Sequence, residues 1–130
     1  MIVRMIVAGS REYNNYEELS EILKYNIDRW TAQGFDIEIV SGCARGADSL
    51  GAKYGEEHNI KVKYMPADWD TYGKSAGYRR NADMLNYAKE EYAVVFAFWN
   101  GTSKGTKNMI DIACKANVAV LVTYFNWKVC

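Results

Sequence analysis

The sequence predicts an α/β protein with a doubly wound, Rossmann-like sheet of five parallel strands and helices on both faces. Two observations lead to this prediction: five short apolar runs recur along the chain, and four helical patterns separate them. This strict alternation is typical of parallel strands joined by right-handed helical crossovers. The chain of 130 residues suits a single domain, residues 1–130, and is too short for a closed eight-stranded α/β barrel.

The predicted strands are rich in Val, Ile, Phe and Tyr, and several are near-continuous apolar runs, which favours burial on both faces. They span residues 2–8, 35–40, 60–65, 92–98 and 118–124. We expect them in the order 3-2-1-4-5, numbered along the chain. Aromatic residues alternate in the last two strands, and we expect all four in the core: Tyr92, Phe96, Phe98 and Tyr124.

The predicted helices span residues 16–31, 46–58, 80–89 and 106–116. Apolar residues spaced by three and four mark the first of them. Asn14 or Asn15 can cap its N-terminus, and Gly34 suits the turn that ends it. The connection from 68 to 81 is too long for a simple strand-to-helix loop.

Composition excludes several classes of protein. Sixteen basic and sixteen acidic residues cancel, which argues against a general nucleic-acid or anionic-membrane binder. Three widely spaced cysteines form no disulfide framework and no zinc pattern, so we expect reduced thiols, a cytoplasmic location and no metal site. The apolar N-terminal run is too short to span a membrane and lacks the features of a signal peptide.

Three strand-to-helix loops contain glycine. They read "AGSREYNN" (8–15), "SGCARGAD" (41–48) and "WNGTSKGTKN" (99–108). Glycine lets backbone amides approach an anion, and each loop leads into a helix N-terminus, where orphan N–H groups favour phosphate. Any one loop could be only a tight turn, since none is a G-x-G-x-x-G or Walker A sequence. In the expected strand order, however, all three border one crevice at the switch point.

Four segments resemble, in order, the motifs of the YspA-like branch of the SLOG superfamily, which is named from the Smf/DprA and LOG proteins. They read "AGSREY", "SGCARGADSLGAKYGEEHNI", "MPADWDTYGKSAGYRRNADML" and "NGTSKGTKNMIDIA". The resemblance covers nearly the whole chain. It implies a Rossmann-like domain, bacterial or phage in origin, that binds nucleotides or nucleotide-derived ligands.

LOG enzymes, a different branch, hydrolyse the N-glycosidic bond of nucleoside monophosphates with a glutamate after a glycine-rich loop. In this chain that position holds Met109, whose thioether cannot act as a general base. The prediction therefore leans away from an enzyme. Asp48, Asp68 and Asp111 are the carboxylates that could restore hydrolysis, although Asp111 would face elsewhere on its helix.

Motifs and resemblance together give the candidate site. The residues assigned to ligand or phosphate binding are Gly9, Ser10, Arg11, Gly42, Arg45, Gly46, Asp48, Arg80, Asn81, Gly101, Thr102, Lys104, Gly105 and Thr106. Arg45 is the favoured phosphate cation. Other interpretations stay open: Asp48 could be a helix N-terminal charge, Trp69 could be a base-stacking ring or a core anchor, and Arg80 could pair with Asp68 or Asp70.

The favoured function is binding of a nucleotide or nucleotide derivative for sensing or sequestration, with no separate cofactor. The alternatives are a LOG-like nucleotide N-glycosidase and a DprA-like single-strand DNA module, which the neutral charge disfavours. We also expect a homodimer, because a helical stripe of Met84, Leu85 and Ala88 and the apolar segment "VLVTYFNW" exceed what one small domain would cover.

Overall fold

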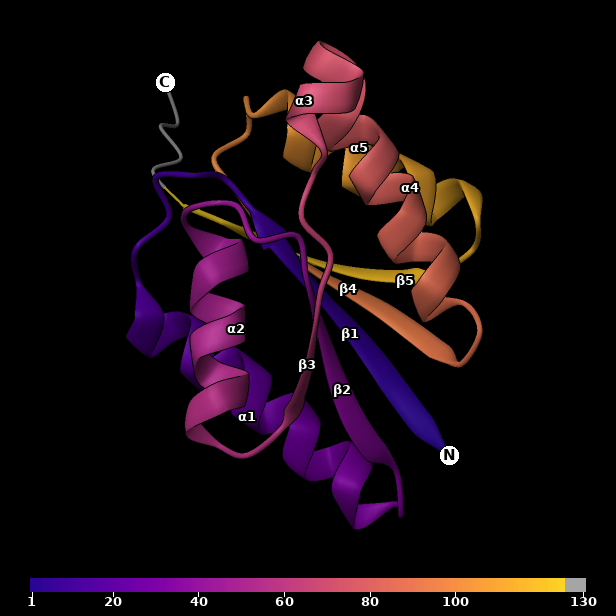
Figure 1. The fold of residues 1–130 in the computed structure, drawn as a ribbon. Helices are drawn as coiled ribbons and strands as arrows, with labels where there is room; N and C mark the ends of the chain where they lie inside the picture. The colour runs from indigo at the N-terminus through magenta and orange to yellow at the C-terminus, as the bar shows by residue number, and fades with distance from the viewer. Residues whose placement is uncertain (126–130) are drawn as a thin grey trace.

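The structure, a computed structural model, describes residues 1–125 and contains one five-stranded sheet in that range (Figure 1). The strands are β1 (Ile2–Gly9), β2 (Asp36–Ser41), β3 (Lys61–Tyr64), β4 (Tyr92–Trp99) and β5 (Ala119–Tyr124). All neighbouring strands are parallel, in the order β3-β2-β1-β4-β5. The predicted fold class and strand order are confirmed.

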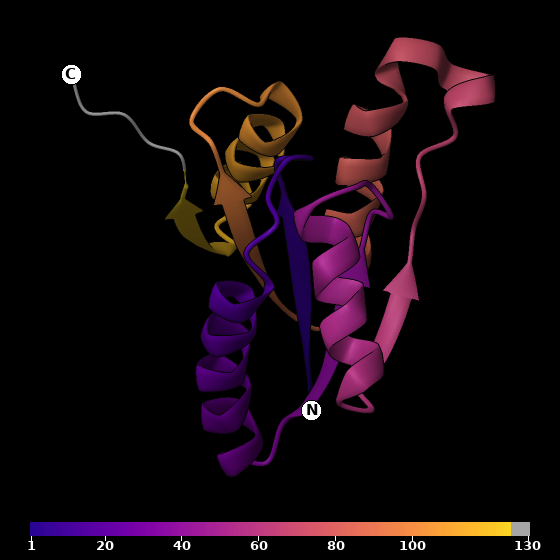
Figure 2. The ribbon, with the colours of Figure 1, turned by 90° about the vertical axis from the view of Figure 1, so that its left-hand side faces the viewer.

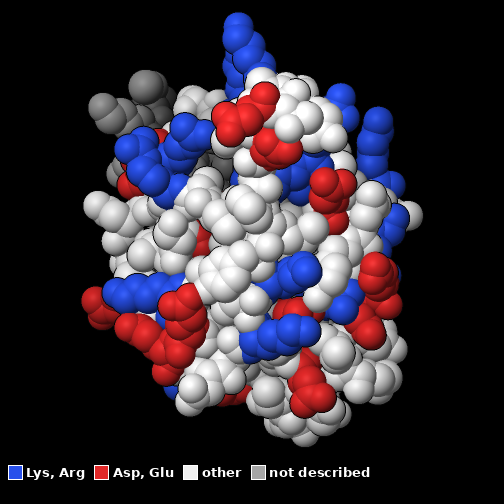
Figure 3. All heavy atoms as spheres, viewed as in Figure 1, with Lys and Arg blue, Asp and Glu red and all other residues white. Residues whose placement is uncertain are grey.

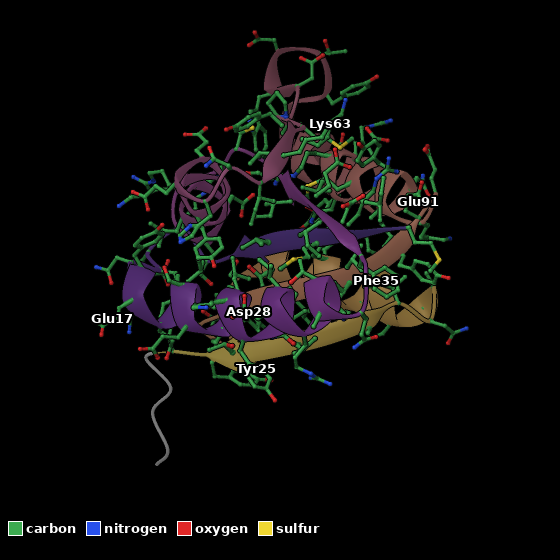
Figure 4. The ribbon with its side chains drawn as sticks, turned by 90° about the horizontal axis from the view of Figure 1, so that it is seen from below. Glu17, Tyr25, Asp28, Phe35, Lys63 and Glu91 are labelled. Atoms are coloured by element: carbon green, nitrogen blue, oxygen red, sulfur yellow. The ribbon has the colours of Figure 1, made fainter. Side chains whose placement is uncertain are left out.

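Helices cover both faces of the sheet (Figure 2). They are α1 (Tyr16–Ala32), α2 (Ala47–Glu57), α3 (Trp69–Tyr72), α4 (Ala76–Ala88) and α5 (Lys104–Lys115), with a 3₁₀ turn, η1 (Gly73–Ser75), between α3 and α4. Seen from below, α1 runs across one face of the sheet, with Glu17 in its first turn and Phe35 just beyond its end (Figure 4). None of the described helices is long and apolar enough to cross a membrane.

Alternating side chains of the central strand β1 build two cores. Val3, Met5 and Val7 pack with α1 and α2, in a cluster that includes Leu23. Ile6 and Ala8 point to the opposite face, where they pack with α4 and α5. The period of two residues in a strand causes this division, and it explains why β1 is apolar on both faces.

Local signals set the ends of several elements. Asn15 caps α1, because its Oδ1 accepts a hydrogen bond from Glu18 N at 3.0 Å, and Gly34 follows the helix with a φ of 91°. The long connection before α4 folds into α3 and η1, and α4 then begins earlier than the predicted residue 80. Asp68 Oδ1 accepts from Thr71 N at 3.1 Å and so caps α3.

Two predictions about apolar residues are wrong. Phe96 and Phe98 are buried as expected, but Tyr92 and Tyr124 are about half exposed because they lie at the ends of their strands. The stripe of Met84, Leu85 and Ala88 packs inside the core against the sheet, so it cannot form an exposed dimer face. The end of "VLVTYFNW" lies outside the described residues, and the homodimer stays a prediction.

Candidate functional site

Two adjoining hollows lie where the strands end and the helices begin. The larger has a volume of about 410 Å³ and the smaller about 320 Å³. They share four lining residues: Arg11, Ala44, Trp69 and Arg80. In the sheet, β2 and β3 lie on one side of β1, and β4 and β5 lie on the other. The order of the strands therefore reverses next to β1, and the larger hollow occupies this switch point.

The larger hollow gathers many of the predicted site residues. Those that line it are Gly9, Arg11, Asp48, Trp69, Arg80, Asn81, Gly105 and Thr106. The smaller hollow is lined by Arg45 and Gly42 together with Cys43, Pro66, Ala67 and the four shared residues. Loops after β1, β2 and β4 therefore do meet at one edge of the sheet, and the long connection before α4 completes the walls.

Asp48 is the buried charged group of the larger hollow. It lies in the first turn of α2 and is 3% exposed. Burial raises the pKa of Asp48 to about 6, although nearby Arg80 and hydrogen bonding to the backbone amides of Ala44, Gly9 and Asp48 itself oppose this rise. Its carboxylate forms no salt bridge with any residue in the described range. It therefore retains capacity to accept a hydrogen bond from a ligand.

Arg80 is the cation nearest to this carboxylate. Its Nη1 donates to Gly42 O at 2.6 Å and its Nε donates to Asn81 Oδ1 at 3.1 Å. The proposed pairing with Asp68 or Asp70 is absent from the salt bridges among residues 1–125. Arg80 instead fixes the loop after β2 and borders both hollows.

The glycines of the first two loops lie close to other parts of the protein. A Cβ on Gly42 would lie 2.7 Å from both Arg80 Nη1 and Asp48 Oδ2, and one on Gly9 would lie 2.3 Å from Phe98 O. Gly46 has a φ of +80°, and a Cβ on it would lie 2.2 Å from Ser10 O. These glycines let parts of the protein approach one another. At Gly105, which also lines the larger hollow, a Cβ would meet no atom of the described residues within 4 Å.

Buried polar side chains hold the loops together. Asn81 Nδ2 donates to Gly105 O at 3.1 Å and to Asn108 Oδ1 at 3.0 Å, which ties α4 to α5. Ser10 Oγ accepts from Asn100 N at 3.2 Å and joins the loops after β1 and β4. Thr106 Oγ1 lies 3.2 Å from Ser103 Oγ.

Several predicted residues line neither hollow: Ser10, Gly46, Gly101, Thr102, Lys104 and Asp111. Asp111 pairs instead with Lys107 at 2.7 Å on an exposed part of α5, one helical turn apart. Thr102 belongs to a turn organised by Asn100, whose Oδ1 accepts from Thr102 N at 2.9 Å and Ser103 N at 2.8 Å. Asp111 therefore lies outside the larger hollow.

The sequence-based assignment missed other lining residues. They are Ala8, Glu12, Ala44, Lys74, Gly77, Tyr78, Asn100, Ser103 and Met109. Glu12 contacts the loop after β4, because its Oε1 accepts a hydrogen bond from Asn100 Nδ2. Glu12 and Asn100 could have been predicted as lining residues, because both lie in the glycine-containing loops after β1 and β4. Lys74 and Tyr78 could not, because they reach the hollow only through the folding of the connection before α4.

Trp69 borders both hollows and is 49% exposed, so it is no buried anchor. A Cβ on Gly77 would lie 3.4 Å from its ring, which places the indole against the first turn of α4. Cys43 lies at the smaller hollow, with a φ of 66°. Burial raises the pKa of its thiol, so the thiolate that an anion site would favour is disfavoured here.

Residues 3–72 match the family described as YAcAr, the YspA, cpYpsA-related SLOG family. The chain belongs to this family. A similar protein is the Gene 61 protein of Mycobacterium phage D29, which is 29% identical over 123 residues, covering 91% of this chain and 94% of the relative. No solved structure matches the chain significantly. The matched SLOG region contains β1 to α3, and therefore Asp48, Arg45 and Trp69.

Proposed function

We propose that the larger hollow binds a nucleotide or a nucleotide-derived ligand, for sensing or sequestration. Membership of the SLOG family indicates a nucleotide-related ligand in general terms. The volume of about 410 Å³ falls within the range of small-molecule sites. The position at the switch point of a parallel sheet is where such folds bind ligands.

The observation that carries the proposal is Asp48, a buried carboxylate that borders the hollow and has no salt-bridge partner among residues 1–125. A carboxylate in this position suits a ribose hydroxyl or an amino group of a base, because both donate hydrogen bonds. Arg80 supplies the opposite charge at the same wall. A ligand with both donor groups and an anionic group, as a nucleotide has, matches this pair.

The half-exposed ring of Trp69 is the proposed platform for a base. We expect Trp69→Ala to weaken nucleotide binding by about 1–3 kcal/mol, the usual contribution of a stacked base. Tyr72→Ala is the matched control, because Tyr72 lies in the same short helix, is similarly exposed and lines neither hollow.

A thermal-shift screen against mononucleotides, cyclic dinucleotides and ADP-ribose derivatives provides the ligand for this test. A ligand at about a hundred times its Kd stabilises the fold by roughly 2.7 kcal/mol. Calorimetric titration of wild type, Trp69→Ala and Tyr72→Ala then measures the affinities. If no compound in the screen stabilises the protein, or if the two variants lose affinity equally, the proposal is wrong.

Hydrolysis of the N-glycosidic bond is the second candidate, and the raised pKa of Asp48 is the observation that favours it. Against it, Met109 is fully buried in the wall of the hollow, at the position that resembles the LOG glutamate. Chromatography of each binding nucleotide after incubation decides between the two. Release of free base that Asp48→Asn abolishes would establish an enzyme.

The DNA-binding alternative receives no comparable support. On the face that carries β3 and α2, basic and acidic side chains intermingle and no continuous basic band appears (Figure 3). A groove that tracks a nucleic-acid backbone would need such a band.

A further inference from the structure

The two hollows differ in the charge of their walls. Three arginines line the smaller one, Arg11, Arg45 and Arg80, and no Asp or Glu of the described part of the chain does. The larger hollow has both signs, since Asp48 and Glu12 line it together with basic residues. Of the two adjoining hollows, one therefore has purely cationic charged walls and the other has walls of mixed charge.

The arginines of the smaller hollow retain free donors. Arg11 and Arg45 are exposed and form no salt bridge with residues 1–125. Arg80 donates from Nε and Nη1, which leaves further N–H groups of its guanidinium without a described acceptor. Like charges gathered around one hollow repel one another, so an anion bound among them would be favoured.

We propose that the two hollows form one divided site, in which the smaller hollow binds two linked phosphate groups and the larger hollow binds the nucleoside part of the same ligand. This inference rests on the proposed function, and it narrows the ligand to nucleoside diphosphates and their derivatives. Arg80 and Trp69 stand at the junction, where the nucleoside meets its phosphates.

Charge favours two phosphates over one. A single phosphate carries a charge of about −1.5 to −2 at neutral pH and would leave three guanidinium groups incompletely neutralised. Arginine is suited to this task because its planar fork binds phosphate oxygens in pairs.

The test uses inorganic pyrophosphate and orthophosphate as probes, titrated calorimetrically at one fixed ionic strength. We expect pyrophosphate to bind at least about tenfold more tightly than orthophosphate. Arg45→Ala should weaken pyrophosphate binding roughly tenfold or more, because it removes a charge-assisted contact, and Arg45→Lys should restore only part of the affinity. Arg79→Ala is the control, since Arg79 is exposed on α4 and lines neither hollow.

A nucleoside and its diphosphate, taken from the base that the screen selects, complete the experiment. Arg45→Ala should reduce the affinity for the diphosphate and leave that for the nucleoside unchanged. Equal affinities for pyrophosphate and orthophosphate, or wild-type pyrophosphate binding by Arg45→Ala, would overturn the divided site even if nucleotides bind. Arg45-dependent pyrophosphate binding without any nucleotide binding would support the anion compartment and refute the nucleotide function.

One further arm addresses nucleic acid as the source of the phosphates. A single-stranded oligonucleotide should bind no more tightly than the nucleoside diphosphate. Tighter binding of the oligonucleotide, with the same dependence on Arg45, would overturn the inference in favour of a strand backbone.

Discussion

Glu38 and Asp48 are both buried carboxylates, and their surroundings differ. Glu38 on β2 is 2% exposed and has three side-chain partners: Arg4 Nε donates to its Oε1 at 2.8 Å and the Tyr87 hydroxyl donates to the same atom at 2.7 Å, while Lys61 Nζ lies 3.1 Å from Oε2 as an ion pair that forms no well-directed hydrogen bond. Burial acts to raise its pKa, but these donors outweigh burial, and the pKa of Glu38 is lowered.

Asp48 lacks such side-chain donors and borders a hollow. Burial dominates over the influence of Arg80 and the backbone amides, and the pKa of Asp48 is raised. The comparison teaches that burial of a charge does not by itself mark a binding group. Glu38 connects β1, β2, β3 and α4 within the protein, whereas Asp48 keeps accepting capacity for a partner that comes from outside.

The largest effect is expected at Glu38. Glu38→Ala should destabilise the protein by about 3–5 kcal/mol, because it removes the carboxylate 2.8 Å from the largely buried Arg4 and leaves it the more distant Glu90, at 3.6 Å. Urea unfolding at pH 7 measures the change. Asp28→Ala is the control: Asp28 is exposed and pairs with Lys24 one helical turn away on α1, a contact worth about 0.3–0.5 kcal/mol. Similar losses in the two variants would show that the engagement of Glu38 contributes nothing beyond a surface pair.

Asp48 should make stability depend on pH. Its pKa in the folded state is about 6, above the ordinary value of 3.8, so its contribution is fully present below pH 4 and is lost as the pH rises through 6. The total loss should reach about 3 kcal/mol at 1.36 kcal/mol per pKa unit. Asp48→Asn should therefore flatten the dependence of the unfolding free energy on pH between 4 and 7, and should make the variant more stable than wild type at pH 8.

Denaturant titrations at pH 4, 5, 6, 7 and 8 test this expectation. Asp111→Asn serves as the control, because Asp111 is exposed on α5 and lines neither hollow. If the unfolding free energy of Asp48→Asn varied with pH as that of wild type does, burial would impose no free-energy penalty on the ionised Asp48 carboxylate. The contrast with Glu38 would then disappear.

Gly42 and Gly105 test the surroundings of Asp48 further, with the smallest expected changes in stability. Gly42→Ala would bring a methyl group within 2.7 Å of both Arg80 and Asp48, so we expect a loss of about 1–3 kcal/mol. Gly105→Ala meets nothing within 4 Å and lies in α5, so stability should be unchanged or gain up to about 1 kcal/mol, while the methyl group narrows the larger hollow. Thermal unfolding and nucleotide titration of both variants measure this. A larger loss of stability in Gly105→Ala than in Gly42→Ala would contradict the conclusion that Gly42 is crowded and Gly105 has room for a side chain.

The fold was predictable because its signals are local and repeated. Apolar runs such as that of β1 and the alternation with helices determine a parallel sheet, and the short connections restrict the strand order. Predictions failed where a pattern is compatible with more than one environment. The helical periodicity of Met84, Leu85 and Ala88 identifies an apolar face, but it does not say whether the sheet or a second molecule covers that face.

The sequence alone determined that three glycine-containing loops would lie at one edge of a parallel sheet, and it identified Asp48, Arg80 and Trp69 among the residues there. Only the tertiary structure decided their roles. It shows that Gly42 makes room for Arg80 and Asp48, and that Arg45 and Asp48 border different hollows. The physical reason is range: strand and helix preferences act over a few neighbouring residues, whereas the burial of Asp48 and the approach of Arg80 depend on segments more than thirty positions apart.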